Sequence, residues 1–164
     1  MFTGQQSVAL DGKNRLLIPS RIREEMAALA GDASVVYLTK GYDGCLVMFP
    51  REVFENMAGQ HARLLRYEEP KDRSVNRVFF GEAEKIVLDG QGRILVPERL
   101  KCAAGLAKDL TLVGVFDRLE LWDRDKWDSY CTAGEASFDQ DARDVFQTRR
   151  ADECVREKVD RAEE

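Results

Sequence analysis

The chain has 164 residues, of which 44% are hydrophobic and 34% are charged, and its formal net charge is −5. This composition is typical of a soluble globular protein, and no apolar run approaches the roughly 18 residues that a membrane span requires, which excludes a membrane-spanning protein. The first six residues lack the basic and apolar regions of a signal peptide, so we expect a cytoplasmic protein.

The acidic charge is concentrated at the C-terminal end of the chain. Residues 135–164 contain ten acidic and six basic side chains, a net charge of −4, which leaves residues 1–134 at −1. Residues 11–23 contain four basic side chains and one acidic side chain. An acidic chain with such a basic segment can still bind phosphate groups when several copies act together.

The first fifty residues predict two strands, a helix and two further strands. Pro19 suits the first position of a helix, Ile22, Met26 and Leu29 form its apolar face, and Gly31 ends it. Asp11-Gly12 predicts a turn, because glycine takes a positive φ without steric cost. The apolar runs that predict strands are residues 7–10, 15–18, 35–38 and 46–49.

The middle of the chain predicts a helical connector. Apolar positions between Arg51 and Gly81 follow a helical spacing, which we expect to be interrupted near Gly59 and broken at Pro70. A short further helix should then end at Gly81.

The second half of the chain repeats the elements of the first. Pro97 again opens a helix, and residues 89–92 again form a turn. Strands are expected at residues 84–88, 93–96, 110–116 and 119–122.

The tail predicts a charged helix. Phe138, Ala142, Val145 and Phe146 form one apolar stripe at helical spacing, and Val155 and Val159 form another. Both a solvated or self-packing helix and an oligomer contact are consistent with this pattern.

An internal repeat connects the two halves. Residues 10–22 match residues 88–100 at an offset of 78, with Asp, Gly, Arg, Leu, Pro and Arg recurring in register. Residues 45–54 match residues 118–127 at an offset of 73. Each copy has about 50 residues, and a unit of that size buries only a marginal hydrophobic core by itself. The two copies should therefore pack on each other.

The repeat predicts an α+β fold. We expect two tandem ββαββ repeats that form a pseudo-symmetric, β-barrel-like core with helices at its periphery. The expected parts are residues 1–54 and 82–130 for the repeats, 55–81 for the helical connector, and 131–164 for the charged tail.

The two turns carry the candidate binding residues. The first tip contains Lys13, Asn14 and Arg15, and the second contains Arg93. Arginine presents a planar fork of donors that suits phosphate or guanine, lysine adds a charge for the DNA backbone, and asparagine can pair with adenine. A hairpin tip is compact enough to enter a DNA groove.

A structural role is the alternative for the same turns. Asp11 and Asp89 can each pair with the arginine four residues later, and aspartate also caps the backbone of its own turn. The second tip carries less charge than the first, so a structural role for Arg93 stays open. The residues expected to shape the turns are Asp11, Gly12, Asp89, Gly90 and Gly92.

These motifs resemble the MraZ family of bacterial transcription regulators, within the SpoVT/AbrB-like group of swapped-hairpin DNA-binding folds. The shared features are Met1-Phe2-x-Gly4, the turns Asp11…Arg15 and Asp89…Arg93, and Leu121-Trp122. The resemblance covers roughly residues 1–130. Asn14 departs from it, since many relatives have glycine there, and asparagine accepts the same backbone geometry.

The resemblance implies a function and an assembly. It implies a homo-oligomeric ring that binds tandem short boxes of double-stranded DNA in the promoter of its own cell-division and cell-wall operon. It implies DNA contacts first by Arg15, then by Lys13 and Asn14, and more weakly by Arg93. We therefore expect a nucleoid-associated protein.

Two rival functions are an enzyme and an antitoxin-like protein-interaction module of the same fold. No catalytic motif surrounds the single histidine, His61, and its charged neighbours predict a solvated helix face. Gly90-Gln91-Gly92 is followed by Leu95 where a dinucleotide-binding loop needs its third glycine. The four cysteines lack metal-site spacing and read as reduced thiols. We expect no cofactor, metal or small-molecule substrate.

Overall fold

The computed structural model describes the backbone of residues 1–160 and the side chains of residues 1–146. Tertiary contacts divide the chain into two compact units, Met1–Arg124 and Asp125–Glu164. The first unit contains every strand found in the described residues, together with four helices.

The first unit contains the expected ββαββ order twice. The connector between the two repeats contains α2 (Arg51–Leu64) and α3 (Pro70–Phe79). The first repeat consists of β1 (Gln5–Ala9), β2 (Arg15–Leu17), α1 (Ser20–Ala30), β3 (Val35–Lys40) and β4 (Leu46–Pro50). The second consists of β5 (Glu84–Val87), β6 (Arg93–Leu95), α4 (Glu98–Ala104), β7 (Asp109–Val115) and β8 (Arg118–Asp123).

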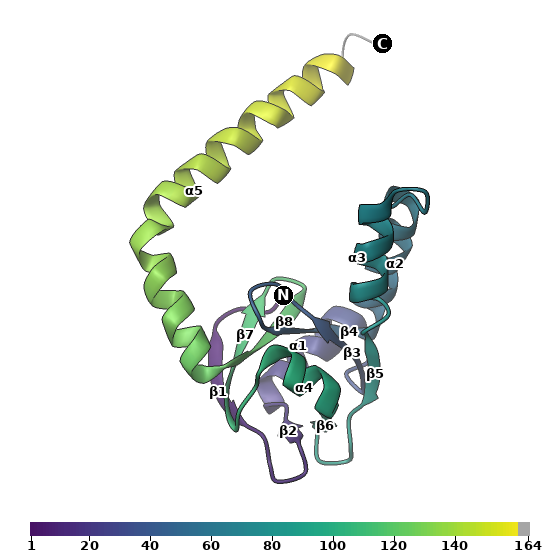
Figure 1. Cartoon of the computed structure of the whole chain (residues 1–164), viewed down its shortest axis with the longest axis vertical. Helices are drawn as coiled ribbons and strands as arrows, with labels where there is room; N and C mark the ends of the chain where they lie inside the picture. Colours follow the sequence, from purple (N-terminus) through teal and green to yellow (C-terminus); the bar gives the residue numbers. More distant parts are fainter. Residues whose placement is uncertain (161–164) are drawn as a thin grey trace. The chain divides into compact units, whose positions relative to one another are not determined.

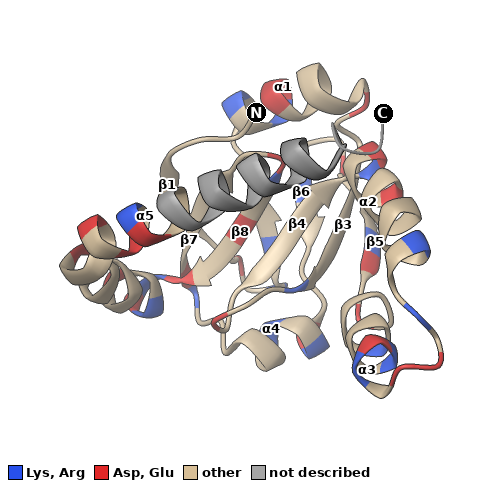
Figure 2. Cartoon of the chain, turned by 90° about the horizontal axis from the view of Figure 1, so that it is seen from above, with Lys and Arg blue, Asp and Glu red and all other residues tan. Residues whose placement is uncertain are grey.

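The two repeats share one antiparallel sheet. Within the described residues, six strands are hydrogen-bonded in the order β1-β7-β8-β4-β3-β5, so each edge strand of one repeat pairs with a strand of the other. The helices α1 and α4 lie on opposite sides of this sheet (Figures 1 and 2). All five residues of β4, in the middle of the sheet, are buried.

The expectation of a β-barrel-like core was wrong, because the sheet is open. The edge strands β1 and β5 are not paired with each other in the described structure. Each leads into a turn, and the strands that follow, β2 and β6, form a separate two-stranded sheet. The chain therefore leaves the six-stranded sheet after β1 and after β5, and β2 and β6 pair with each other outside it.

The pairing of β2 with β6 also corrects the local hairpins expected at the two turns. Strand β1 pairs along its length with β7, and it approaches β2 at the isolated bridge between Leu10 and Leu16. Each turn therefore connects two strands whose main partners belong to the other repeat. We call the β2–β6 sheet and its two turns the ribbon, and it projects from one end of the first unit (Figure 1).

The core is built from both repeats. Leu16 and Ile94, the central pair of the ribbon, have no exposed surface and join a cluster that includes Ile22 of α1 and Leu100 of α4. Gly31 ends α1 in a left-handed conformation, as expected, but Ala30 is buried there and Leu29 is exposed.

Helix α2 is continuous through Gly59, where an interruption was expected. A glycine inside a helix costs only about 1 kcal/mol relative to alanine. Phe54 holds the helix in place, since its ring stacks on Tyr37 at 4.3 Å and lies 6.3 Å from Phe79 of α3. Pro70 is the first residue of α3, a position where its missing N–H is not needed.

The described part of the tail belongs to one long helix, α5 (Arg124–Asp160). The stripe of Phe138, Ala142, Val145 and Phe146 lies within its described side chains, and the two phenylalanines are well exposed. The second expected stripe, Val155 and Val159, lies outside the residues whose side chains are described.

Candidate nucleic-acid interface

Asp11 organises the first turn of the ribbon. Its Oδ1 accepts hydrogen bonds from the backbone N–H groups of Lys13 at 2.8 Å and Arg15 at 2.9 Å. Its Oδ2 accepts from Nε and Nη2 of Arg15, both at 2.7 Å. One carboxylate therefore fixes both the turn backbone and the direction of the arginine side chain.

The second turn has the same geometry. Oδ1 of Asp89 accepts from the backbone N–H groups of Gln91 at 2.9 Å and Arg93 at 3.0 Å, and Oδ2 accepts from Nε of Arg93 at 2.7 Å. Asn14 and Gly92 occupy equivalent left-handed positions, with φ of 57° and 77°. Asparagine tolerates this conformation, which explains why it can replace glycine.

Each turn is also held by the other repeat. Ile18 donates its N–H to the carbonyl of Gly92 at 3.0 Å, and Val96 donates to the carbonyl of Asn14 at 2.9 Å. The ribbon thus has an approximate two-fold symmetry, in which the residue that follows each strand donates a hydrogen bond to the opposite turn.

Helix α4 binds the side chain of Asn14. Nζ of Lys101 donates to Asn14 Oδ1 at 3.0 Å, and Asn14 Nδ2 donates to Glu98 Oε2 at 2.5 Å. Arg23, the equivalent of Lys101 in α1, lies over Gly92, where a Cβ atom would stand 2.7 Å from Nε of Arg23. Asn14 therefore positions α4 against the first turn, a role that the sequence did not predict.

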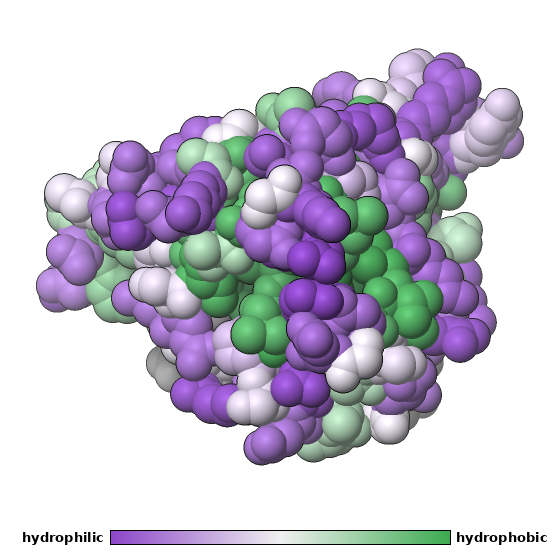
Figure 3. Space-filling view, turned by 90° about the horizontal axis from the view of Figure 1, so that it is seen from below, coloured by the Kyte–Doolittle hydropathy of each residue, from purple (hydrophilic) through white to green (hydrophobic). Residues whose placement is uncertain are grey.

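The ribbon presents a mixed face to solvent. Arg15 lies opposite Leu95, and Arg93 lies opposite Leu17, whereas Leu16 and Ile94 point into the core. Leu17 is 53% exposed and Leu95 is 57% exposed. Figure 3, the view from the ribbon end, shows hydrophobic residues at the centre of this face with hydrophilic residues around them.

The electrostatics of the two tips differ. The hydrogen bonds from Arg15 lower the pKa of Asp11 from 3.8 to about 2, and those from Arg93 lower the pKa of Asp89. Both carboxyl groups are therefore ionised at neutral pH, and each neutralises the arginine that it holds. Lys13 adds a positive charge to the first tip alone, and Lys101 and Lys108 line a pocket beside the same turn.

The leucines of this face and the two lysines beside the first turn were not among the residues predicted from the sequence. The alternation Arg-x-Leu in both β2 and β6 was the available signal for Leu17 and Leu95. The offset of 78 aligns Lys101 with Arg23 and could have indicated a shared role.

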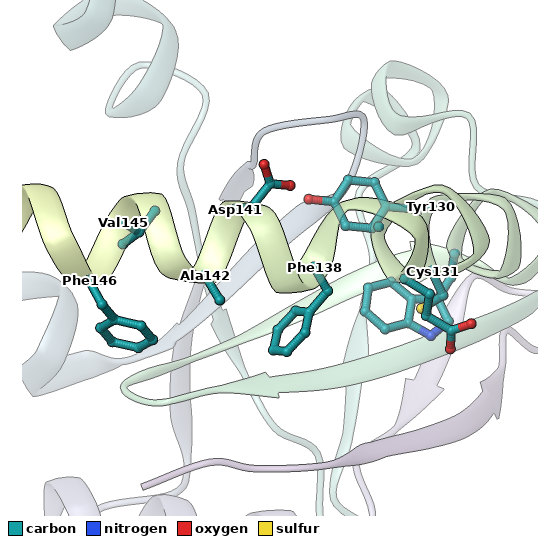
Figure 4. Close-up of a pocket in the computed structure, with 10 residues that line it drawn as sticks. Tyr130, Cys131, Phe138, Asp141, Ala142, Val145 and Phe146 are labelled. Carbon is teal, nitrogen blue, oxygen red and sulfur yellow. The ribbon is translucent and has the colours of Figure 1, made fainter.

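A second exposed surface lies on α5. Phe138, Ala142 and Phe146 point to the same side of the helix (Figure 4). The groove along this side is further lined by Trp127 and Tyr130, whose rings stack at 6.0 Å. The lining of this groove is mostly apolar, and exposed apolar surfaces can mark sites of protein contact.

His61, the single histidine of the chain, lies on α2. His61 was expected on a solvated helix face, but its ring is half-buried and lies 6.0 Å from the ring of Phe80. No group of three or more metal-ligating side chains occurs among the described residues. Across the same residues, no helix is both long enough and apolar enough to cross a membrane.

The family comparison matches both halves of the chain. A model of the family described as "MraZ protein, putative antitoxin-like" matches residues 1–78 and again residues 79–149. The chain belongs to the MraZ family. The doubled match agrees with the internal repeat and with the ββαββ order found twice in the structure.

Members of the MraZ family named "Transcriptional regulator MraZ" align with most of the chain. The relative from Acetivibrio thermocellus is 39% identical over 130 residues, which are 79% of this chain and 86% of the relative. The relative from Clostridium acetobutylicum is 39% identical over 142 residues, 87% of this chain and 93% of the relative. The relative from Heliobacterium modesticaldum is 37% identical over 140 residues, 85% and 93% of the two chains.

The Asp11–Arg15 pair predicts a specific titration. The folded-state pKa of Asp11 is lowered, so its contribution to stability is present above pH 3.8 and is lost as the pH falls toward 2. Carboxyl-carbon NMR should give a midpoint near pH 2 for Asp11, and Arg15→Ala should raise that midpoint.

Asp89 is the internal control for this titration, because its partner is Arg93. Its midpoint should stay below the ordinary range in the Arg15→Ala variant. An Asp11 midpoint near 3.8 in the unaltered protein would contradict the pairing.

Proposed function

We propose that this protein is a sequence-specific DNA-binding transcription regulator and that the ribbon is its DNA interface. The observation that carries the proposal is the outward face of β2 and β6, which has an Asp-x-x-x-Arg turn at each end. The naming of the relatives as transcriptional regulators supports it.

The shape of the ribbon suits the major groove of DNA. The major groove of B-DNA admits a two-stranded β-ribbon, and arginine pairs there with the O6 and N7 atoms of guanine. Asp11 holds Nε and Nη2 of Arg15, so the guanidinium is directed before DNA arrives and Nη1 remains to donate to a base or phosphate. This favours Arg15 as the principal contact.

The other predicted residues take graded roles in the proposal. Lys13 provides a backbone phosphate contact, because it is exposed at the tip. Asn14 acts mainly through Lys101 and Glu98, which bind both ends of its amide. Arg93 repeats the geometry of Arg15 at a tip without an added lysine, so its contribution to affinity should be smaller.

The difference between the tips gives the ribbon a direction. A symmetric ribbon would suit a palindromic site, whereas Lys13-Asn14 at one end and Gln91-Gly92 at the other favour one orientation on DNA. Direct repeats of a short box suit subunits that all face the same way. We therefore propose tandem boxes in the promoter of the protein's own cell-division and cell-wall operon as the target.

A homo-oligomeric ring in the cytoplasm, associated with the nucleoid, completes the proposal. One ribbon makes few phosphate contacts, and adjacent ribbons on adjacent boxes gain affinity through effective concentration. The exposed apolar face of α5 supports self-association, and a second copy of the chain is the partner that we propose for it. Assembly would also explain how a chain of net charge −5 binds DNA.

An antitoxin-like interaction module is the alternative function. The family description contains this term, and the apolar face of α5 could bind a different protein. A module of that kind would not need the ribbon to select a promoter sequence, so DNA binding distinguishes the two functions.

Replacement of Arg15 tests the proposed interface. Arg15→Ala should weaken binding to the promoter fragment at least tenfold in a gel-shift assay and leave the oligomer intact by size-exclusion chromatography. Arg51→Ala is the matched control, because Arg51 also pairs with a carboxylate four residues away, on α2. Equal affinity of the Arg15→Ala and unaltered proteins would contradict the proposal.

Box number tests the proposed assembly. A fragment with several boxes should bind at least tenfold more tightly than a fragment with one box. Phe138→Asp should lower the subunit number measured by light scattering and remove most of this gain, with little change in single-box affinity. Equal affinity for one box and several boxes would refute the avidity mechanism.

A further inference from the structure

We propose that Leu17 and Leu95 are sequence-reading residues, which contact the 5-methyl groups of thymines in the major groove. This inference rests on the proposed DNA binding by the ribbon and assigns it a second kind of contact. Neither leucine was among the residues expected to contact DNA, which were all polar or charged.

The exposure of the two leucines is not explained by folding. The residues that anchor the ribbon are Leu16 and Ile94, which are fully buried, whereas Leu17 and Leu95 are more than half exposed in the structure. Leucine is also not among the residues that strands favour intrinsically. Two large apolar side chains therefore lie on the solvent side of a strand pair.

The strand register places each leucine beside an arginine. Leu95 is directly opposite Arg15, and Leu17 is directly opposite Arg93. Side chains directly opposite each other in an antiparallel pair have Cβ atoms roughly 4.5–5.5 Å apart. The outward face thus carries two arginine–leucine pairs, related by the approximate two-fold axis through the Leu16–Ile94 pair.

The chemistry of these pairs matches the major-groove edges of two bases. Arginine binds guanine, and apolar side chains contact the methyl group that distinguishes thymine. The roughly 4.5–5.5 Å between the Cβ atoms of a pair lies between one and two times the roughly 3.4 Å that separates stacked bases along a strand. Each arginine–leucine pair therefore reads a guanine and a thymine in neighbouring base pairs.

The turn hydrogen bonds keep this pattern fixed. The carboxylates of Asp11 and Asp89 hold the guanidinium groups of the two arginines. The buried pair Leu16–Ile94 prevents the ribbon from slipping by one residue. A one-residue slip would turn the leucines inward. The spacing between the arginine and leucine contacts is therefore set by the fold before DNA binds.

Uracil substitution tests this inference, because uracil differs from thymine only by the missing methyl group. The probe is the promoter fragment of the protein's own gene, with thymines in a box replaced by uracil one at a time. Loss of a contacted methyl should weaken binding of the unaltered protein about fourfold. The same uracil should have little further effect on Leu95→Ala or Leu17→Ala, whichever contacts that base.

Control variants separate this pattern from general damage. Val87→Ala removes an exposed apolar side chain of β5, outside the β2–β6 face, and should keep the full response to uracil. Leu16→Ala marks the effect of a lost core side chain, and the Leu17→Ala and Leu95→Ala variants should melt well above it.

Three negative results have different meanings. Tight promoter binding that is unaffected by any uracil would overturn the methyl contact and leave the DNA-binding proposal intact. A uracil effect that persists unchanged in both leucine variants would also overturn the assignment to these residues. Failure of the unaltered protein to prefer the promoter over random DNA would instead overturn the proposed function.

Discussion

The pairing of β2 with β6 is the constraint on which the architecture depends. Each strand has three residues, too few for a stable independent hairpin, and each reaches the other across the boundary between repeats. The pair buries Leu16 and Ile94 in the common core. It also brings the two turns to one end of the first unit, where neither repeat alone could place them.

The same pairing links stability to the proposed function. The inward residues of the ribbon belong to the core, and the outward residues form the face proposed to bind DNA. Each Asp–Arg pair then serves the turn and the binding surface together, since the carboxylate that caps the turn also directs the guanidinium. In Asp11, for example, Oδ1 binds the backbone of the turn and Oδ2 binds the arginine that is proposed to contact DNA.

Much of the fold could be predicted from local patterns. The order of strands and helices followed from apolar periodicity, from Pro19 and Pro97 before helices, and from Gly31 after one. The strand partners could not be predicted in this way, because a strand of three residues carries no information about which neighbour it pairs with. The interruption expected at Gly59 is absent because the packing of Phe54 outweighs the small cost of a glycine within a helix.

The candidate site was predicted in part for the same reason. The turn motif could be seen directly, and the structure places Asp11, Arg15, Asp89 and Arg93 in two equivalent turns. The contact of Asn14 with Lys101 joins residues 87 positions apart, so only the folded chain brings it to light. The exposed leucines likewise become a surface feature once β2 lies beside β6.

Hydrogen exchange measured by mass spectrometry tests the central claim most directly. On addition of promoter DNA to the full-length protein, we expect protection of the segments 10–18 and 88–96, with α2 and α3 unchanged. The protection should be weaker with random DNA of the same length. Protection confined to the connector helices, or none at the ribbon, would contradict the account.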